Sequence, residues 1–232
     1  MQGLKLTWQL CTPMVVGGSP LHLDALLTFA KAEHDLGKGW RDKSETLTQE
    51  LNIPVEKAVH DGVSCWKASA LIAPEPGEHA MRFWTRKSDA YDYSQRLTRG
   101  DLDVKTKLPL AKHSYAQKFD TARGVYKQMF KFYPVREIQT LQAWCVGDFD
   151  EVAELLDPDN GFITYLGSKT RMGHGRIRSF DIKEDDEALE KWQMRVMPWE
   201  CDGYVPMEAA VRPPYWDVNN RQRAWVSPEL FN

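Results

Sequence analysis

The sequence lacks several patterns that mark common classes of enzyme and membrane protein. It contains no G-x-x-x-x-G-K-[ST] loop, which excludes the usual nucleoside-triphosphate site. Its four cysteines form no C-x-x-C pair, and none has a histidine at zinc-finger spacing. No apolar run approaches the roughly 18–20 residues of a membrane span. We therefore expect no metal, no cofactor and no membrane contact.

The cysteines also bear on the cellular compartment. Three of the four lie in apolar surroundings, which is typical of buried thiols rather than disulfides. The sequence shows no signal peptide. Both observations favour a reducing cytoplasm.

Charge is unevenly distributed along the 232 residues, although the formal net charge is only −3. The stretch 82–136 contains 13 Lys and Arg against 5 Asp, a net charge of +8, so the remainder carries −11. A basic segment within an acidic protein indicates one surface that faces a polyanion.

A glycine-rich loop is the most informative stretch of the sequence. It follows an apolar segment, Phe162 to Leu166, and contains Gly167, Gly173 and Gly175. Its basic side chains are Lys169, Arg171, Arg176 and Arg178. Glycine lets the backbone approach a ligand closely, and these cations are suitable donors to phosphates. The loop therefore predicts a site for a polyanion, with a simple hairpin turn bearing solvated charges as the alternative.

The hydrophobic periodicity of the sequence, with its turn-forming and helix-capping residues, predicts an α+β protein. The expected elements are a strand over 4–11, a helix over 20–36 that begins at Ser19-Pro20, a hairpin of strands 63–72 and 78–86, strands over 127–133 and 138–146, a short helix from Asp148, an exit strand over 176–182, a helical turn over 185–191 and an extended tail over 198–232. This order matches two ferredoxin-like units with antiparallel sheets, the second partial and carrying the glycine-rich loop. Sheets of this RRM-like type commonly bind RNA on an exposed face.

The segment 87–123 is polar and basic and has few branched apolar residues. Long inserts of this kind in a compact domain are usually functional or disordered. The basic residues of this segment and its edge include Arg86, Lys87, Arg96, Arg99, Lys105, Lys107 and Lys112. With tyrosines interleaved, they favour a nucleic-acid-binding arm, and a solvated loop held by local ion pairs is the alternative.

Two motifs resemble a known family. The turn and helix from Gly17 to Leu27 resemble the opening of CRISPR RAMP proteins, and Leu166 to Ile177 resembles their glycine-rich loop. Within that superfamily, the sequence Pro-Leu-His-Leu-Asp-Ala-Leu-Leu is most similar to that of the Cas-five-class subunit of type IV effector complexes. The resemblance implies a single ferredoxin-like RAMP domain over 1–232, with 87–123 as an inserted β-hairpin thumb.

The resemblance also implies a function and partners. The subunit would be non-catalytic, would bind the 5′ handle of crRNA and would cap a filament of Cas-seven-like backbone subunits. It would contact the large, Cas-eight-like subunit where target DNA is first inspected. The residues that the resemblance implies to contact RNA are Lys169, Arg171, Gly173, His174, Gly175 and Arg176. The predicted RNA-binding set also includes Gly17, Gly18, His22 and Arg178.

Catalysis and an unrelated function remain as alternatives. Some RAMP relatives cut guide-RNA precursors, and His22 or His113 could serve as the general base in such a reaction. Each histidine has a structural explanation, since His22 lies beside a Gly-Gly turn and His113 lies in the arm. Asp24 is an acid or metal candidate in principle, but one turn into a helix it more often complements the helix dipole. A second alternative is an unrelated α+β domain whose loop binds a phosphate-bearing ligand.

Overall fold

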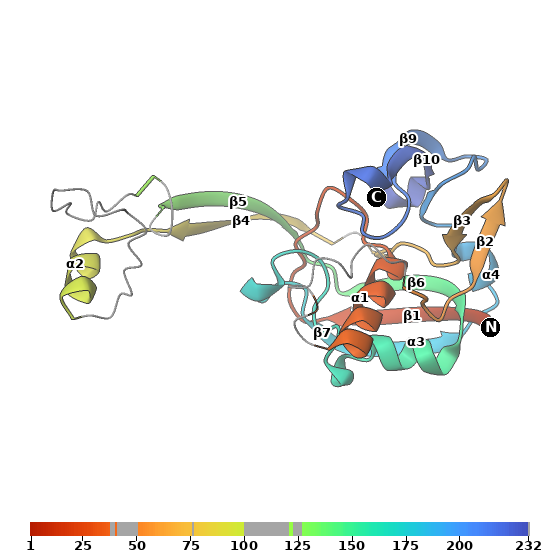
Figure 1. Ribbon diagram of the computed structural model, residues 1–232, viewed down its shortest axis with the longest axis horizontal. Helices are drawn as coiled ribbons and strands as arrows, with labels where there is room; N and C mark the ends of the chain where they lie inside the picture. Colours follow the sequence, from red (N-terminus) through yellow and green to blue (C-terminus); the bar gives the residue numbers. More distant parts are fainter. Residues whose placement is uncertain (38–39, 41–50, 76, 100–120, 123–126, 232) are drawn as a thin grey trace. The chain divides into compact units, whose positions relative to one another are not determined.

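The computed structural model describes residues 1–37, 40, 51–75, 77–99, 121–122 and 127–231 (Figure 1). The chain divides into two compact units. The larger combines Met1–Ala80 with Val135–Asn232, and the smaller is Met81–Pro134. The predicted arm, 87–123, thus lies within the smaller unit. Among the described helices, none is long and apolar enough to cross a membrane.

The larger unit is built on a three-stranded sheet in which β1 (Gln2–Leu10) is the central strand. It pairs antiparallel with β6 (Thr140–Gly147) on one side and β7 (Ile177–Glu184) on the other. Strict alternation along β1 places Leu4, Leu6 and Trp8, all fully buried, on one face. The strand predicted for this stretch is confirmed.

The outer edge of β6 is occupied by residues 67–72. Ser69 donates its N–H to the carbonyl of Trp144, and Ile72 and Gln142 exchange two backbone hydrogen bonds. Isolated antiparallel bridges join Ala68 to Cys145 and Ile72 to Gln142. The sheet edge is therefore extended by a fourth, irregular segment, and the order across the sheet is 67–72, β6, β1, β7.

Two helices cover the apolar face of this sheet (Figure 1). The first, α1 (Leu23–Leu36), buries Leu23, Leu27 and Ala30. The second, α3 (Phe149–Leu156), buries Val152, Leu155 and Leu156, as its spacing predicts. Asp148 caps α3 by accepting a hydrogen bond from the N–H of Glu151 at 3.0 Å. The predicted start of this helix is confirmed.

The opposite face of the sheet is polar along its central strand. Lys5 is paired across the sheet with Trp144 and Lys183, and Thr7 with Gln142 and Asp181. On β6, Trp144 and Val146 of this face are buried. Val146 packs with Cys65, Trp192 and Met197, and the ammonium groups of Lys5 and Lys191 lie 5.5 and 5.0 Å from the centre of the Trp144 ring. This face therefore presents charge and hydrogen-bonding groups along β1 and is covered by a small apolar cluster at one end of β6.

Smaller elements complete the larger unit. They are β2 (Lys57–His60), β3 (Val63–Trp66), η3 (Pro158–Asn160), η4 (Thr170–Met172), α4 (Ala188–Lys191), β8 (Val196–Met197), β9 (Val205–Ala210), η5 (Val218–Asn220), β10 (Arg221–Val226) and η6 (Pro228–Phe231). β10 is the central strand of a second sheet, between β8 and β9. The C-terminal tail, predicted as extended, thus forms a small sheet with its own core of Val196, Val211, Ala224 and Val226.

Arg195 holds these parts together from a completely buried position. Its guanidinium donates to the carboxylate of Asp24 at 3.0 Å and to the hydroxyl of Tyr215 at 2.8 Å. It also donates to the carbonyls of Trp66, Ala68, Val196 and Val211. Burial is the largest single influence and lowers the pKa of Arg195, but Asp24, Tyr215 and Cys65 together outweigh it and raise that pKa. One side chain therefore ties α1, the sheet edge, β8 and the tail to one another.

Three predictions of the fold are wrong. Strand 63–72 does not pair with 78–86; β3 pairs instead with β2 through the turn Asp61-Gly62, where both residues have positive φ. The predicted strands of separate units, β1 in the first and β6 and β7 in the second, lie in one sheet, so these described strands do not form two units. Helix α1 starts at Leu23 rather than Pro20, because Leu21 and His22 make backbone contacts with Leu71 and Ala70.

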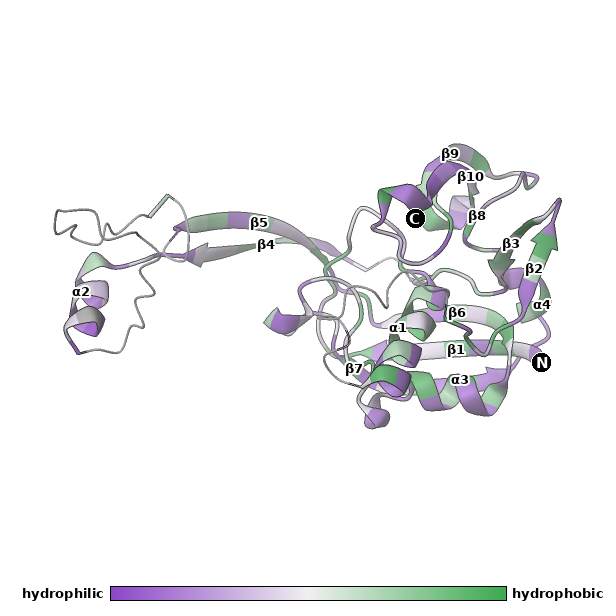
Figure 2. Cartoon of the chain, viewed as in Figure 1, coloured by the Kyte–Doolittle hydropathy of each residue, from purple (hydrophilic) through white to green (hydrophobic). Residues whose placement is uncertain are grey.

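The smaller unit contains a two-stranded ribbon and a helix. The ribbon pairs β4 (His79–Arg86) with β5 (Met129–Arg136), and both strands run to its boundary with the larger unit. Helix α2 (Ala90–Thr98) follows β4. Figure 2 shows hydrophobic and hydrophilic residues alternating along β5. Pro134 lies within β5, so this strand continues past the end of the strand predicted over 127–133.

Replacing Arg195 tests its structural role. Arg195→Met keeps the volume but leaves Asp24 buried without its cation, so we expect the free energy of unfolding to fall by about 3–5 kcal/mol. Lys31→Ala is the control, because it removes the exposed 3.1 Å pair with Asp35 and should cost less than about 1 kcal/mol. Urea unfolding of both variants measures the difference. Equal losses would show that Arg195 has no special role.

Candidate nucleic-acid interface

The glycine-rich loop, residues 167–176, is bent by four residues with left-handed backbone. These are Gly167, Lys169, Gly173 and Gly175, with φ values of 84°, 59°, 85° and 70°. Between them lies one turn of 3₁₀-helix, Thr170–Met172. Only glycine adopts this region without cost, which explains three of the four positions. Lys169 is a non-glycine exception, and such residues are uncommon in folded proteins.

The loop lies against the segment that follows β1. Ser168 donates its N–H to the carbonyl of Val15 at 3.0 Å, and Gly175 donates to that of Pro13 at 3.0 Å. Cys11 donates to the carbonyl of Arg176 at 2.9 Å, and the Thr12 hydroxyl accepts from the N–H of Arg176 at 2.8 Å. The loop is thus in direct contact with residues 11–15, which lie about 150 residues earlier in the sequence and just before the Gly17 motif.

Gly175 makes this close approach possible. A Cβ atom placed on it would lie 1.8 Å from the carbonyl oxygen of Leu166, and no side chain fits at that distance. The two backbones are also joined by a hydrogen bond, in which Leu166 donates its N–H to the Gly175 carbonyl at 2.8 Å. Gly173 differs, because a Cβ there would meet nothing within 4 Å. Gly175 is required by packing, and Gly173 by backbone conformation alone.

The cations of the loop are available to a ligand. Lys169, Arg171, Arg176 and Arg178 are all exposed. None of the ion pairs between described residues involves any of them. His174 is half-buried, and its Nδ1 lies 3.2 Å from the carbonyl oxygen of Pro13. The site therefore offers four positive side chains on a backbone that is held from behind.

The predicted glycines of the first motif lie next to the loop. Gly17 and Gly18 are exposed, and they follow Val15, which forms an antiparallel bridge with Ser168. A Cβ on Gly17 would lie 3.9 Å from the Ser168 hydroxyl. Gly17 thus borders the cationic loop, and Gly18 follows it in the chain.

His22 does not belong to this surface. Its side chain is 1% exposed, and its ring stacks on that of Tyr215 with centroids 4.2 Å apart. Burial, and then the charge of Arg195, lower the pKa of His22 well below its ordinary value, so the ring is neutral. This burial argues against the predicted contact with RNA and against a role as general base. Asp24, considered for the helix dipole, is instead the partner of Arg195.

Two of the cysteines are buried thiols with raised pKa values. Cys65 and Cys145 are buried, and burial raises their pKa values to about 11 and about 12. All four cysteines are free thiols. The prediction of buried thiols rather than disulfides is confirmed for these two.

The predicted arm is described only in part. Arg86 donates twice to the carbonyl of Lys127, at 2.9 and 2.7 Å. Lys87, Arg96 and Arg99 are exposed, the last two on or just beyond α2. Lys105, Lys107, Lys112 and His113 lie outside the described residues. The predicted role of the arm therefore remains a prediction.

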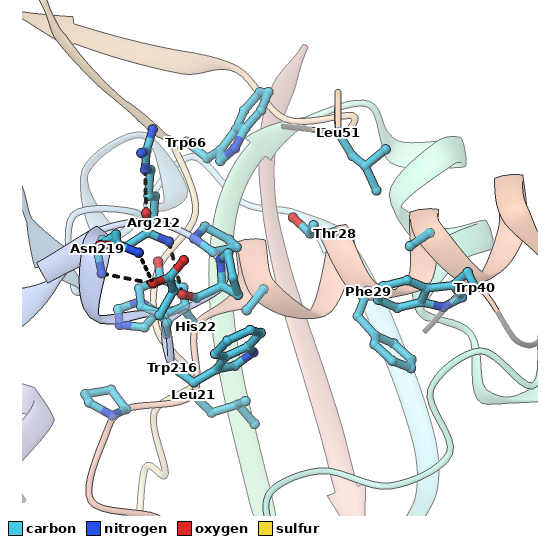
Figure 3. A pocket seen from close by; sticks show the side chains of 18 of the residues that line it. Leu21, His22, Thr28, Phe29, Trp40, Leu51, Trp66, Arg212, Trp216 and Asn219 are labelled. Atoms are coloured by element: carbon cyan, nitrogen blue, oxygen red, sulfur yellow. Dashed lines mark hydrogen bonds between the residues drawn. The ribbon is translucent and has the colours of Figure 1, made fainter. Parts of the chain in front are cut away.

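The sequence did not indicate a groove between α1 and the tail, which Figure 3 shows. The groove has a volume of about 500 Å³. Its lining is mostly apolar and includes Leu21, Phe29, Trp40 and Trp216. Trp216 is 75% exposed. His22 and Tyr215 also line the groove, and Lys169, Arg171, Arg176 and Arg178 do not.

The comparisons with known proteins identify the class of the chain. The sequence model of a family of CRISPR type IV associated proteins matches residues 2–227. The chain belongs to this family, CRISPR type IV associated protein Csf3. The resemblance to type IV CRISPR proteins that the two motifs indicated is confirmed.

Comparisons with curated proteins and with solved structures do not narrow the assignment beyond the family. No curated protein matches the chain. A chain from a cryo-EM structure of the Type III-B Cmr-beta bound to cognate target RNA is similar at a TM-score of 0.38 and 10% identity. The likeness covers 79% of this chain and 61% of that chain, so the protein spans about three fifths of its length.

Two glycine substitutions test how the loop is built. Gly173→Ala should cost about 1–2 kcal/mol, the penalty for a side chain in left-handed backbone. Gly175→Ala should cost a further 1–3 kcal/mol or so, since the added carbon overlaps the Leu166 carbonyl. Thermal unfolding measures this extra cost as an unfolding midpoint roughly 2–10 °C lower for Gly175→Ala than for Gly173→Ala. Equal midpoints would mean that the two backbones do not approach as described.

Proposed function

We propose that the protein is a non-catalytic RNA-binding subunit of a type IV CRISPR effector complex, and that the glycine-rich loop holds the 5′ handle of crRNA. The observation that carries the proposal is the group of four exposed cations on a glycine-bent loop, in a chain of the Csf3 family. Phosphates need positive side chains and close backbone approach, and the loop offers both.

The fold supports this proposal. The order strand, helix, strand, strand, helix, strand, arranged antiparallel as 67–72, β6, β1, β7, is that of a ferredoxin-like domain, which we propose is a RAMP domain. The face opposite the two helices is covered in part over β6, and it carries Lys5 and Lys183 on β1 and β7. A single strand of RNA that crosses the loop could continue along this face, as strands do on other sheets of this architecture.

The smaller unit supports a thumb. It is inserted between 67–72 and β6, and it carries Arg82, Arg86, Lys87, Arg96 and Arg99 among its described residues. Basic side chains on a ribbon and a helix suit contact with a phosphate backbone. We propose that this unit is the nucleic-acid-binding thumb, and that target DNA is a second ligand at the same complex.

The proposal also includes protein partners. In a type IV complex the subunit would cap the filament of Cas-seven-like backbone subunits and contact the large, Cas-eight-like subunit. The proposal that the subunit binds RNA without cutting it draws support from His22, whose burial removes one of two candidate bases. The other candidate, His113, lies outside the described residues.

Neutralising the loop tests RNA binding directly. Arg171→Gln/Arg176→Gln should weaken binding of a labelled repeat-derived RNA at least tenfold, because two charge-assisted contacts to phosphate are lost. The slope of log affinity against log salt should also become shallower by about 1.4, since each contact with single-stranded RNA contributes about 0.7. Fluorescence anisotropy at several salt concentrations measures both quantities.

The matched control removes two arginines elsewhere. Arg221 and Arg223 are exposed on β10, so Arg221→Gln/Arg223→Gln changes the net charge equally. This control should leave affinity within about twofold, as expected for charges that touch no phosphate. Equal weakening by both variants would show that RNA binding depends on net charge rather than on the loop, which would overturn the proposed site.

A further inference from the structure

The ribbon of the smaller unit carries three exposed phenylalanines that the RNA-binding proposal does not use. Phe83 on β4 is 63% exposed, and Phe130 and Phe132 on β5 are 62% and 59% exposed. Their rings are mutual neighbours, with centroids 5.8 Å apart for Phe83 and Phe130, 6.3 Å for Phe83 and Phe132, and 4.9 Å for Phe130 and Phe132. All three rings therefore lie on one face of the ribbon, which we name the phenylalanine face.

Strand alternation defines the composition of the two faces of the ribbon. Met81, 62% exposed, and Thr85 share the phenylalanine face with Phe83, and Pro134 shares it with Phe130 and Phe132. The strand positions in between belong to the opposite face, and they are Arg82, Trp84, Arg86, Lys131 and Tyr133. From 81 to 86 and from 130 to 134, every charged residue falls on one face and none on the other.

This separation of charge decides what kind of ligand the phenylalanine face fits. A nucleic-acid backbone requires cations, and this face has none along those stretches. The rings also pack at steep angles, 87° between Phe130 and Phe132 and 61° between Phe83 and Phe132. Two of the three pairs thus meet edge to face, and the third, Phe83 with Phe130, is tilted by 37°. No two of the rings are therefore parallel, as the ring surfaces on which successive bases stack would be. An uncharged apolar surface complements such a face better than RNA does.

The exposed area limits the partner further. Phenylalanines each have about 150–250 Å² of surface, so three rings exposed to about 60% leave roughly 360 Å² of apolar area. A patch of this size commonly marks an interaction site. Two copies meeting through it would bury roughly 700 Å², well below the 1,200–2,000 Å² or so of a stable pair. The patch therefore suits one contact within a larger assembly rather than a dimer of this chain.

We propose that the phenylalanine face docks on an uncharged, aliphatic patch of a neighbouring protein subunit, while the opposite, basic face of the same ribbon faces nucleic acid. The inference rests on the proposed function in one respect, namely that the chain works inside a multi-subunit complex. It adds a division of labour between two faces of a ribbon, each set by alternate positions of the same strands.

Photocrosslinking from adjacent positions tests the proposal. The photoreactive residue p-benzoylphenylalanine is introduced at Phe130 or, as the matched control, at Lys131, which lies next along β5 on the opposite face. Each chain is co-expressed with the other subunits and the guide RNA of its type IV system, and the assembled complex is irradiated. We expect position 130 to give an RNase-resistant adduct with another protein subunit, and position 131 to give an adduct with RNA or none with protein.

Several outcomes would overturn the inference. An RNA adduct at position 130 would show base contact, an adduct only with its own chain would show that the face is covered internally, and an adduct with a second copy would show dimerisation. No adduct from an assembled complex would show that the face is open to solvent. A wild-type chain that joins no complex would contradict the proposed function itself, and with it the neighbouring subunit that the inference requires.

A second experiment does not depend on crosslinking. Phe130→Ser/Phe132→Ser should lower recovery of the partner subunits about tenfold or more in 0.5 M NaCl, where exposed charges are strongly screened. Val59→Ser/Val63→Ser is the control, because it removes two exposed apolar side chains from β2 and β3, and it should leave this recovery within about twofold. Circular dichroism of the purified chains checks that both variants remain folded. Equal recovery with the two folded variants would overturn the inference.

Discussion

The buried guanidinium of Arg195 is the interaction on which the larger unit depends. Removing a charge from water is costly, and it is tolerated here because Asp24, Tyr215 and four carbonyls surround the group within 3.2 Å. These acceptors come from five segments: α1, β3, the edge segment 67–72, β8 and the C-terminal tail. None of these segments could move independently without leaving a buried polar group unpaired.

This hub also explains the surroundings of α1. Tyr215 donates to both oxygens of Asp24 at 3.0 Å while it accepts from Arg195, and burial raises its pKa well above the ordinary value. The His22 ring stacks on this tyrosine. The start of α1 is thereby attached to the tail, and the residues just before it, Gly17 and Gly18, are left beside the glycine-rich loop. The buried cluster of Arg195, Asp24 and Tyr215 and the candidate site are thus linked by one short stretch of chain, residues 17–24.

Sequence patterns predicted the parts of the fold that are determined locally. Alternation identified β1, and an aspartate cap with apolar residues at helical spacing identified α3. The glycine-rich loop was also found, because its left-handed positions demand glycine. One local signal was overlooked: Asp61-Gly62, a dipeptide typical of a two-residue hairpin turn, joins β2 to β3.

The remaining features depend on contacts between distant residues, which no local pattern encodes. β4 pairs with β5 across more than 40 intervening residues, so neither strand reveals its partner. Arg195 lies in an ordinary polar-looking stretch, and only its acceptors from five segments show that it is buried. The cations of the site were predictable as a group. Which of them face a ligand depends on the packing of the loop against residues 11–15.

The most direct test of the central claim is a cryo-EM reconstruction of the assembled type IV complex with its guide RNA. The account predicts phosphate oxygens about 3 Å from the guanidinium groups of Arg171 and Arg176, with the RNA crossing the loop beside Gly17 and Gly18. A loop at residues 167–176 that faces solvent, or that is covered by another protein while the RNA lies elsewhere, would contradict it.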